Sequence, residues 1–327
     1  MLTRRRFLNV ASCAAPAVLL GDRFARADWL PPRPVKMIVP YVAGGATDIA
    51  ARICGEAMAE PLKQTVVIEN RGGAAGNIGG AFVAHSEPNG LTLLLGAAGL
   101  LTTNPFLYKN MGFDPVKDLT PVSMVYTSDL VLVVRPSIPA KTIQEFVALA
   151  KSQPGKMNFG SSGNGASTHT AMELFKLIAG IDLQHVPYRG SAAAFSDLLG
   201  GHLQVIMVQV PTVAASVQNG DLRALVVTGN KRNPAIPDVP TMAEAGFHGA
   251  EAMAWGGLLA PAGTSPEIVK ALSVATIAAL GKPEVKTRIS NTGLEAVSST
   301  PEEMAAYMAE ETRKWERVVR EARITAE

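Results

Sequence analysis

The 327-residue chain carries 30 basic and 28 acidic side chains, which gives a formal net charge of only +2 at pH 7. A surface this balanced excludes proteins that attract nucleic acid or anionic lipid over their whole area. The length exceeds what one hydrophobic core usually organises, so we expect two lobes.

The N-terminal segment predicts export from the cytoplasm. Arg4-Arg5-Arg6 precede an uncharged apolar stretch from Val10 to Leu20, and Ala25-Arg26-Ala27 offers small residues at the positions that signal peptidase reads. The apolar stretch is far shorter than the roughly 20 residues that span a bilayer. We therefore expect a twin-arginine signal peptide over residues 1–27, cleavage near Ala27 and a periplasmic mature protein.

Removal of residues 1–27 would leave 25 basic and 27 acidic side chains, a net charge of −2, since that segment holds five arginines and one aspartate. Cys54 would be the single remaining cysteine. An intrachain disulfide and a cysteine-based metal site are then both impossible.

Apolar, β-rich runs alternate with helix-patterned stretches in the first half of the chain. The predicted strands are Val35–Val39, Val66–Ile68, Leu91–Leu95 and Leu130–Val134. The predicted helical stretches are Thr47–Glu60, Gly80–Ala84 and Lys141–Ser152. Such alternation predicts a mostly parallel sheet with helices on both faces.

The same pattern restarts after Pro154-Gly155. Strands are predicted at Met157–Gly160, Leu183–Val186, Val205–Val208, Ala224–Thr228 and Gly256–Ala260, and helices at Thr168–Ile178, Ala192–Leu199, Ser265–Leu280 and Pro301–Ala322. We expect two α/β lobes, joined by two crossover segments near residues 128 and 250, around a ligand cleft. Lobe 1 would comprise residues 28–128 plus 250–327, and lobe 2 residues 129–249.

The segment from Val39 to Asp48 runs from a strand through Gly44-Gly45 into a helix. Glycines expose backbone N–H groups, and a helix N-terminus favours negative charge, so this loop suits a carboxylate or a phosphate. Asp48 falls in the first helical turn, where it could either cap the helix or contact the ligand.

Two further strand-to-helix turns could reach the same cleft. Gly160–His169 is rich in glycine and serine, with Ser167 or Thr168 as the expected helix N-cap. The turn from Val186 to Ser191 offers the aromatic ring of Tyr188 and the cation of Arg189. One loop from each lobe could hold opposite ends of one small molecule.

Motifs typical of dinucleotide binding, nucleophilic catalysis or metal binding are missing from the sequence. The glycines of Gly72–Gly79 lack the surrounding unit of a dinucleotide site. A nucleophile could be imagined at Ser161 or Ser162, with His169 as its base. The sequence has no G-x-S-x-G elbow, however, which such a nucleophile would typically require. The five histidines show no metal-binding spacing. We expect no catalysis, no cofactor and no metal.

Several motifs together resemble the substrate-binding proteins of tripartite tricarboxylate transporters, known as Bug receptors. The likeness runs from about Val35 to Glu311 and rests on the following segments: Val39-Pro40-Tyr41, Gly44–Asp48, Val67–Arg71, Gly76–Gly79, Phe113-Asp114-Pro115, Val186–Gly190, Arg232–Thr241, Trp255–Leu258 and Ala260–Thr264. The resemblance implies a type II periplasmic-binding fold without catalysis, in which the first Gly-Gly loop holds a ligand carboxylate.

The chain departs from the family pattern at Ala43, where a proline is usual, and at Met207–Val210, where an acid is frequent. Loss of that acid argues against a ligand ammonium group there, and Gln209 could donate to the ligand instead. The ligand-binding residues that we expect are Tyr41, Gly44, Gly45, Thr47, Asp48, Ser162, Gly163, Ser167, Tyr188 and Gln209.

The partners that we expect are a small carboxylate and integral-membrane transporter subunits, with no nucleic acid and a monomeric receptor. A ligand-sensing subunit of a signalling system is the alternative function, because it would use the same fold.

Overall fold

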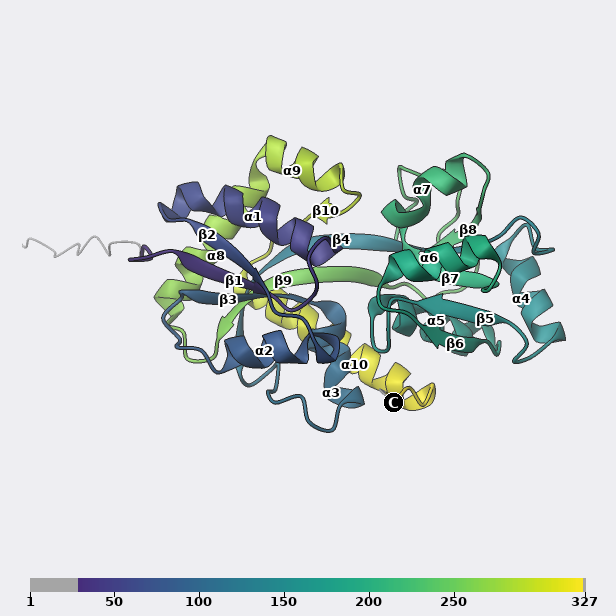
Figure 1. Cartoon of the computed structure of the whole chain (residues 1–327), viewed down its shortest axis with the longest axis horizontal. Coiled ribbons are helices and arrows are strands. Elements are labelled where there is room, and N and C mark those ends of the chain that lie inside the picture. Colours follow the sequence, from purple (N-terminus) through teal and green to yellow (C-terminus); the bar gives the residue numbers. More distant parts are fainter. Residues whose placement is uncertain (1–28, 326–327) are drawn as a thin grey trace, which may run out of the picture.

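Two lobes lie end to end along the molecule, and two long strands pass between them (Figure 1). The computed structural model describes residues 29–325, so the expected signal peptide lies outside the described residues. The connecting strands are β4 (Leu119–Val134) and β9 (Met253–Pro261). The type II periplasmic-binding architecture expected from the sequence is confirmed in this arrangement of two α/β lobes.

The first lobe is built on three parallel strands in the order β2-β1-β3. Their alternation with helices is that of a βαβ unit, as the sequence predicted. The elements are β1 (Val35–Val39), α1 (Ala46–Leu62), β2 (Val66–Asn70), η1 (Ala74–Gly76), α2 (Asn77–Ala84), β3 (Thr92–Ala97), η2 (Gly99–Thr103), α3 (Asn104–Leu107), α8 (Pro266–Gly281), α9 (Pro283–Ser290) and β10 (Glu295–Ala296).

The second lobe repeats this plan with β5 between β6 and β7, all parallel. Strand β8 instead pairs antiparallel with β4. The elements are α4 (Ile143–Ser152), β5 (Asn158–Ser161), α5 (Ser167–Ala179), β6 (Gln184–Pro187), α6 (Ser191–Gly200), β7 (Val205–Gln209), α7 (Val210–Gln218) and β8 (Arg223–Val227).

Strand β4 belongs to both lobes. Its residues from Leu119 to Asp129 pair with β9, and those from Leu130 to Val134 pair with β7. Both pairings are antiparallel, because the chain crosses between the lobes in extended strands and not in helices. The predicted parallel pairing therefore holds for β2-β1-β3 and β7-β5-β6, and fails for every pairing made by β4 and β9.

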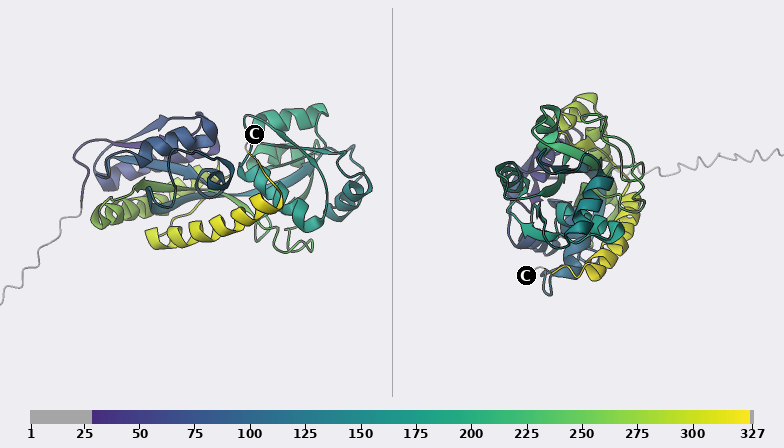
Figure 2. Two further views of the ribbon diagram at one scale, coloured as in Figure 1. Left: turned by 90° about the horizontal axis from the view of Figure 1, so that it is seen from below. Right: turned by 90° about the vertical axis from the view of Figure 1, so that its right-hand side faces the viewer.

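Helix α10 (Pro301–Glu321) lies against both lobes, and Figure 2 shows it running beneath them. Met304 and Met308 pack into the core of the first lobe. Trp315 and Val318 pack into the core of the second. Between these groups, buried Glu311 accepts hydrogen bonds from the indoles of Trp255 (3.3 Å) and Trp315 (2.8 Å). The helix is thus a third link between the lobes.

The lobes also touch directly at two places. A Cβ atom placed on Gly293 would lie 2.0 Å from Cγ of Pro211, at the start of α7. A Cβ on Gly99 would lie 2.7 Å from the carbonyl oxygen of Gly165. Gly293 is therefore required by the proline ring of Pro211, and Gly99 by the backbone of Gly165. Among residues 29–325, no helix is both long and apolar enough to cross a bilayer.

Candidate ligand-binding site

The first loop, residues 40–45, connects β1 to α1 on the side of the first lobe that faces the second (Figure 1). Gly44 has a φ of +87°, which favours glycine, whereas Gly45 has an ordinary φ of −79°. Gly45 is the N-cap of α1 and provides no side-chain acceptor. The exposed loop therefore presents helix N-terminal N–H groups toward the other lobe.

Asp48 is buried, and both of its carboxylate oxygens have partners. It accepts the Gly44 N–H at 2.9 Å, two hydrogen bonds from Arg52 at 3.0 Å and one from Asn70 at 2.9 Å. Burial alone would raise the pKa of this carboxyl, but the hydrogen bonds from Arg52, Gly44 and Asn70 hold it below its usual value. Asp48 therefore does not cap the first turn of α1; its carboxylate fixes the loop at Gly44 instead.

Thr47 and Tyr41 are also engaged within the protein. The Thr47 hydroxyl lies 2.8 Å from the hydroxyl of Tyr126 on β4, and this contact is buried. Burial and the neighbouring Tyr126 raise the pKa of the Tyr41 hydroxyl, against a lowering effect of the Ala97 backbone. These side chains tie the first loop to the connecting strand and to the end of β3.

The second loop, residues 162–166, connects β5 to α5. The predicted N-cap was wrong, because the N-cap of α5 is Ala166. Thr168 instead accepts the Ser162 N–H at 2.9 Å and lies 2.8 Å from the Ser162 hydroxyl. Ser167 begins the helix, and Gly163 has a φ of +133°. Ala166 has no side-chain acceptor, so α5 also begins without a side-chain cap.

Tyr188 and Gln209 lie on neighbouring turns of the second lobe. The Tyr188 hydroxyl donates to Asp197 at 2.7 Å, and burial together with this carboxylate raises the pKa of Tyr188 to about 12. Gln209 accepts a hydrogen bond from Ser191 at 3.2 Å. A Cβ on Gly163 would contact the Tyr188 carbonyl oxygen at 3.4 Å, so the structure brings Ser162, Gly163 and Tyr188 together.

Some helices of this protein begin with a side-chain cap, whereas α1 and α5 begin without one, as do α2, α3, α6, α7 and α9. The side chains of Thr142, Ser265 and Thr300 cap α4, α8 and α10. A carboxylate ligand can supply the acceptors that α1 and α5 lack.

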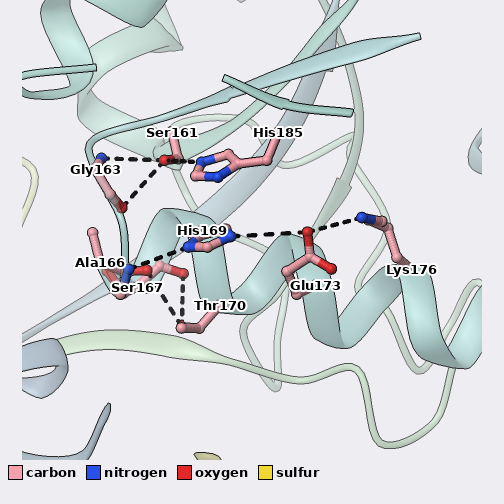
Figure 3. A network of polar contacts seen from close by, with 10 residues as sticks. Ser161, Gly163, Ala166, Ser167, His169, Thr170, Glu173, Lys176 and His185 are labelled. Carbon is pink, nitrogen blue, oxygen red and sulfur yellow. Dashed lines mark hydrogen bonds and ion pairs between the residues drawn. The ribbon is translucent and has the colours of Figure 1, made fainter. Parts of the chain in front are cut away.

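A histidine pair lies directly behind the second loop, and the sequence analysis missed it (Figure 3). Ser161 Oγ lies 2.6 Å from Nε2 of His185 and accepts the Gly163 N–H at 3.1 Å. His169 Nδ1 accepts the Gly165 N–H at 3.2 Å. The sequence carried little signal for this pair, because His185 stands within a predicted strand and His169 within a predicted helix.

Both imidazoles are held neutral by their surroundings. Burial, with smaller effects of His185 and Lys176, lowers the pKa of His169 to about 3. Burial and Lys176 lower the pKa of His185 to about 4. Ser161 is 1% exposed and its histidine is a weak base, so this pair does not form an activated nucleophile. Among the described residues, no cluster of three or more acidic, histidine or cysteine side chains could hold a metal.

We predict that this arrangement makes folding sensitive to mild acid. The unfolded chain takes up a proton at His169 below pH 6.5, whereas the folded protein does so only near pH 3. The folded state therefore keeps its full stability with respect to His169 above pH 6.5. That stability decreases as the pH falls from 6.5 toward 3, because the unfolded chain then binds a proton that the folded protein does not. Between pH 7 and 5, wild type should lose about 2 kcal/mol more unfolding free energy than His169→Asn. Urea denaturation at both pH values measures this difference, and equal losses would contradict it.

Comparison with known proteins places the chain in a family. A model described as the tripartite tricarboxylate transporter family receptor matches residues 50–324. The chain belongs to this family. Its members are periplasmic solute-binding receptors and not enzymes, which agrees with the resemblance found in the sequence.

Relatives of this receptor match it over nearly their whole length. Protein BugT of Bordetella pertussis is 36% identical, covering 96% of this chain and 94% of its own. The structure of Rpa4515 from R. palustris with adipate is 34% identical with a TM-score of 0.82, covering 91% and 99%. MatC from Rhodopseudomonas palustris with bound malate is 33% identical with a TM-score of 0.79, covering 89% and 100%.

Proposed function

We propose that this protein captures a small carboxylate-bearing molecule outside the cytoplasm and delivers it to the integral-membrane subunits of a tripartite tricarboxylate-type transporter. The observation that carries the proposal is the pair of uncapped helix starts, α1 at Gly45 and α5 at Ala166, one in each lobe. Two anion-attracting ends suit a ligand with two acidic or polar ends. Relatives that bind adipate and malate support this ligand class.

In this proposal the backbone N–H groups are the principal donors to the ligand. The polar side chains of Asp48, Tyr188 and Gln209 already have protein partners, so they shape the loops that present those donors. The proposed ligand-binding set remains Tyr41, Gly44, Gly45, Thr47, Asp48, Ser162, Gly163, Ser167, Tyr188 and Gln209.

Binding would act through closure of the two lobes and not through chemistry. A ligand that contacts both lobes stabilises the closed form, because only that form offers both sets of donors. We propose a cofactor-free monomer with lobes at residues 28–128 plus 250–327 and 129–249, with the end of α10 resting on the second lobe. We further propose export through the twin-arginine route with cleavage near Ala27, which N-terminal sequencing of the periplasmic protein would test.

A thermal-shift panel tests the ligand class. The panel contains succinate, malate, glutarate, adipate and benzoate, with their amides and with inorganic phosphate as non-carboxylate controls. We expect at least one acid to raise the melting temperature by several degrees, because a thousandfold excess over Kd adds about 4 kcal/mol of stability. The corresponding amide should give no shift. A response to phosphate or to amides alone would contradict the proposal.

A further inference from the structure

The second loop makes one hydrogen bond to the imidazole of His169 and one to Ser161, whose hydroxyl lies against the imidazole of His185. Gly163 directs its N–H to Ser161 Oγ, which in turn lies against His185, and Gly165 directs its N–H to His169. Both glycines have positive φ angles, +133° and +74°, so this turn is a specific conformation and not an extended chain. The imidazoles therefore determine which loop N–H groups point inward and which remain for a ligand.

The two rings are fixed by stacking. The centroids of His169 and His185 lie 3.7 Å apart, and their planes differ by only 9°. Phe159 stacks on His185 at 4.8 Å. His169 is only 4% exposed, so neither ring nitrogen can turn away from the loop without disturbing the core.

The loop hydrogen bond to His169 requires a neutral ring. Its Nδ1 atom accepts the Gly165 N–H, and protonation would turn that acceptor into a donor facing another donor. Two charged rings 3.7 Å apart would also repel each other.

The charged groups around the pair do not change this conclusion. Glu173 lies 3.9 Å from His169 Nε2 and is itself paired with Lys176 at 2.8 Å. Burial, with a smaller effect of Asp182, raises the pKa of Glu173 against the opposing effect of Lys176. Arg323, just beyond α10, borders a cavity of about 330 Å³ that is also lined by both histidines. The Lys176 cation opposes protonation of both rings.

We propose that His169 and His185 are positioning residues of the ligand site, which hold the second loop in its binding conformation only while the imidazole of His169 is neutral. The inference rests on the proposed function, since it assigns the second loop to the ligand. It adds residues that do not touch the ligand but set its affinity.

Four variants distinguish the role of the ring nitrogen in hydrogen bonding from the role of the ring in packing. His169→Phe keeps an aromatic ring and removes the Nδ1 acceptor. His169→Asn restores an oxygen near the Nδ1 position that does not titrate. His185→Gln does the same at the Nε2 position, and His248→Asn, at an exposed histidine, is the control.

Amide hydrogen exchange tests the hydrogen bonds without any ligand. At pH 7 the protection factor of the Gly165 N–H should fall at least tenfold in His169→Phe and stay near wild type in His169→Asn and His248→Asn. In wild type, protection of Gly163 and Gly165 should decrease between pH 5 and 3, and in His169→Asn that of Gly165 should not. Unchanged protection in His169→Phe would overturn the inference and leave the proposed function standing.

Affinity for adipate, succinate and malate tests the positioning role. At pH 7 the tightest of these should bind His169→Phe about tenfold more weakly than wild type, with rescue by His169→Asn. At pH 3, where about half of the His169 rings are protonated, the wild-type advantage should fall to about half of its value at pH 7, and comparison of variants cancels the titration of the acid itself. A constant ratio at all pH values would overturn the positioning role. Failure of all three acids to bind wild type would count against the proposed function and not against the exchange result.

Discussion

Replacing Gly293 with alanine is expected to push the two lobes apart and to weaken carboxylate binding at least tenfold. A Cβ at this position would lie 2.0 Å from Cγ and 2.3 Å from Cβ of Pro211, and the rigid proline ring cannot move aside. The two lobes would then lose the direct contact between the turn before β10 and the start of α7 that the structure shows. Small-angle scattering should show a larger radius of gyration, and titration a higher Kd.

The chain provides a matched control for this change. Gly220 has nearly the same backbone conformation, φ +81° against +76°, but a Cβ there would meet no atom within 4 Å. Gly220→Ala should carry the same backbone strain without opening the lobes. Pro211→Gly combined with Gly293→Ala should restore both compactness and affinity. If Gly293→Ala leaves scattering and affinity unchanged, the contact is not maintained in solution.

Gly45→Val is expected to abolish binding, by about a hundredfold or more, while leaving the fold intact. Backbone strain would not contribute, because the φ of Gly45 is −79° with a ψ of 168°. A Cβ there would meet only the Val42 carbonyl oxygen, at 3.9 Å. The valine would instead stand over the first-turn N–H groups of α1, where the carboxylate is proposed to bind.

Isothermal titration would measure the loss of binding, and thermal denaturation would show whether the Gly45→Val protein is still folded. Gly281→Val is the control, because a Cβ at Gly281 meets nothing within 4 Å and lies at the far end of α8. Wild-type affinity in a folded Gly45→Val protein would place the carboxylate elsewhere.

Most strands and helices could be predicted from the sequence, because their apolar residues recur at a regular strand or helix spacing. Strand β4 was predicted only from Leu130 to Val134, because Pro121 and Asp129 interrupt the apolar pattern of its first part. Helix α7 was missed because it follows β7 without a loop. Helix α9 was missed because only Val285 and Ile289 of its eight residues are buried.

The strand-to-helix loops could be predicted, since glycine and serine clusters mark them locally. The roles of individual side chains could not, because they depend on partners distant in the sequence. Asp48 is directed into the loop partly by Asn70, and Thr47 meets Tyr126. The contact between Gly293 and Pro211 and the stacking of His169 on His185 likewise arise only when the chain has folded.

Helix α10 has a consequence for the heat capacity of binding. A continuous helix resists bending, so a rotation of one lobe against the other must bend α10 or detach one of its ends. Detachment would expose Trp315, Val318 and Val319, all of which are buried in the structure. Ligand binding that closes an open molecule would bury them again and add a negative heat-capacity change. The measured heat-capacity change of binding would then be more negative than burial of the surface of a small acid can explain.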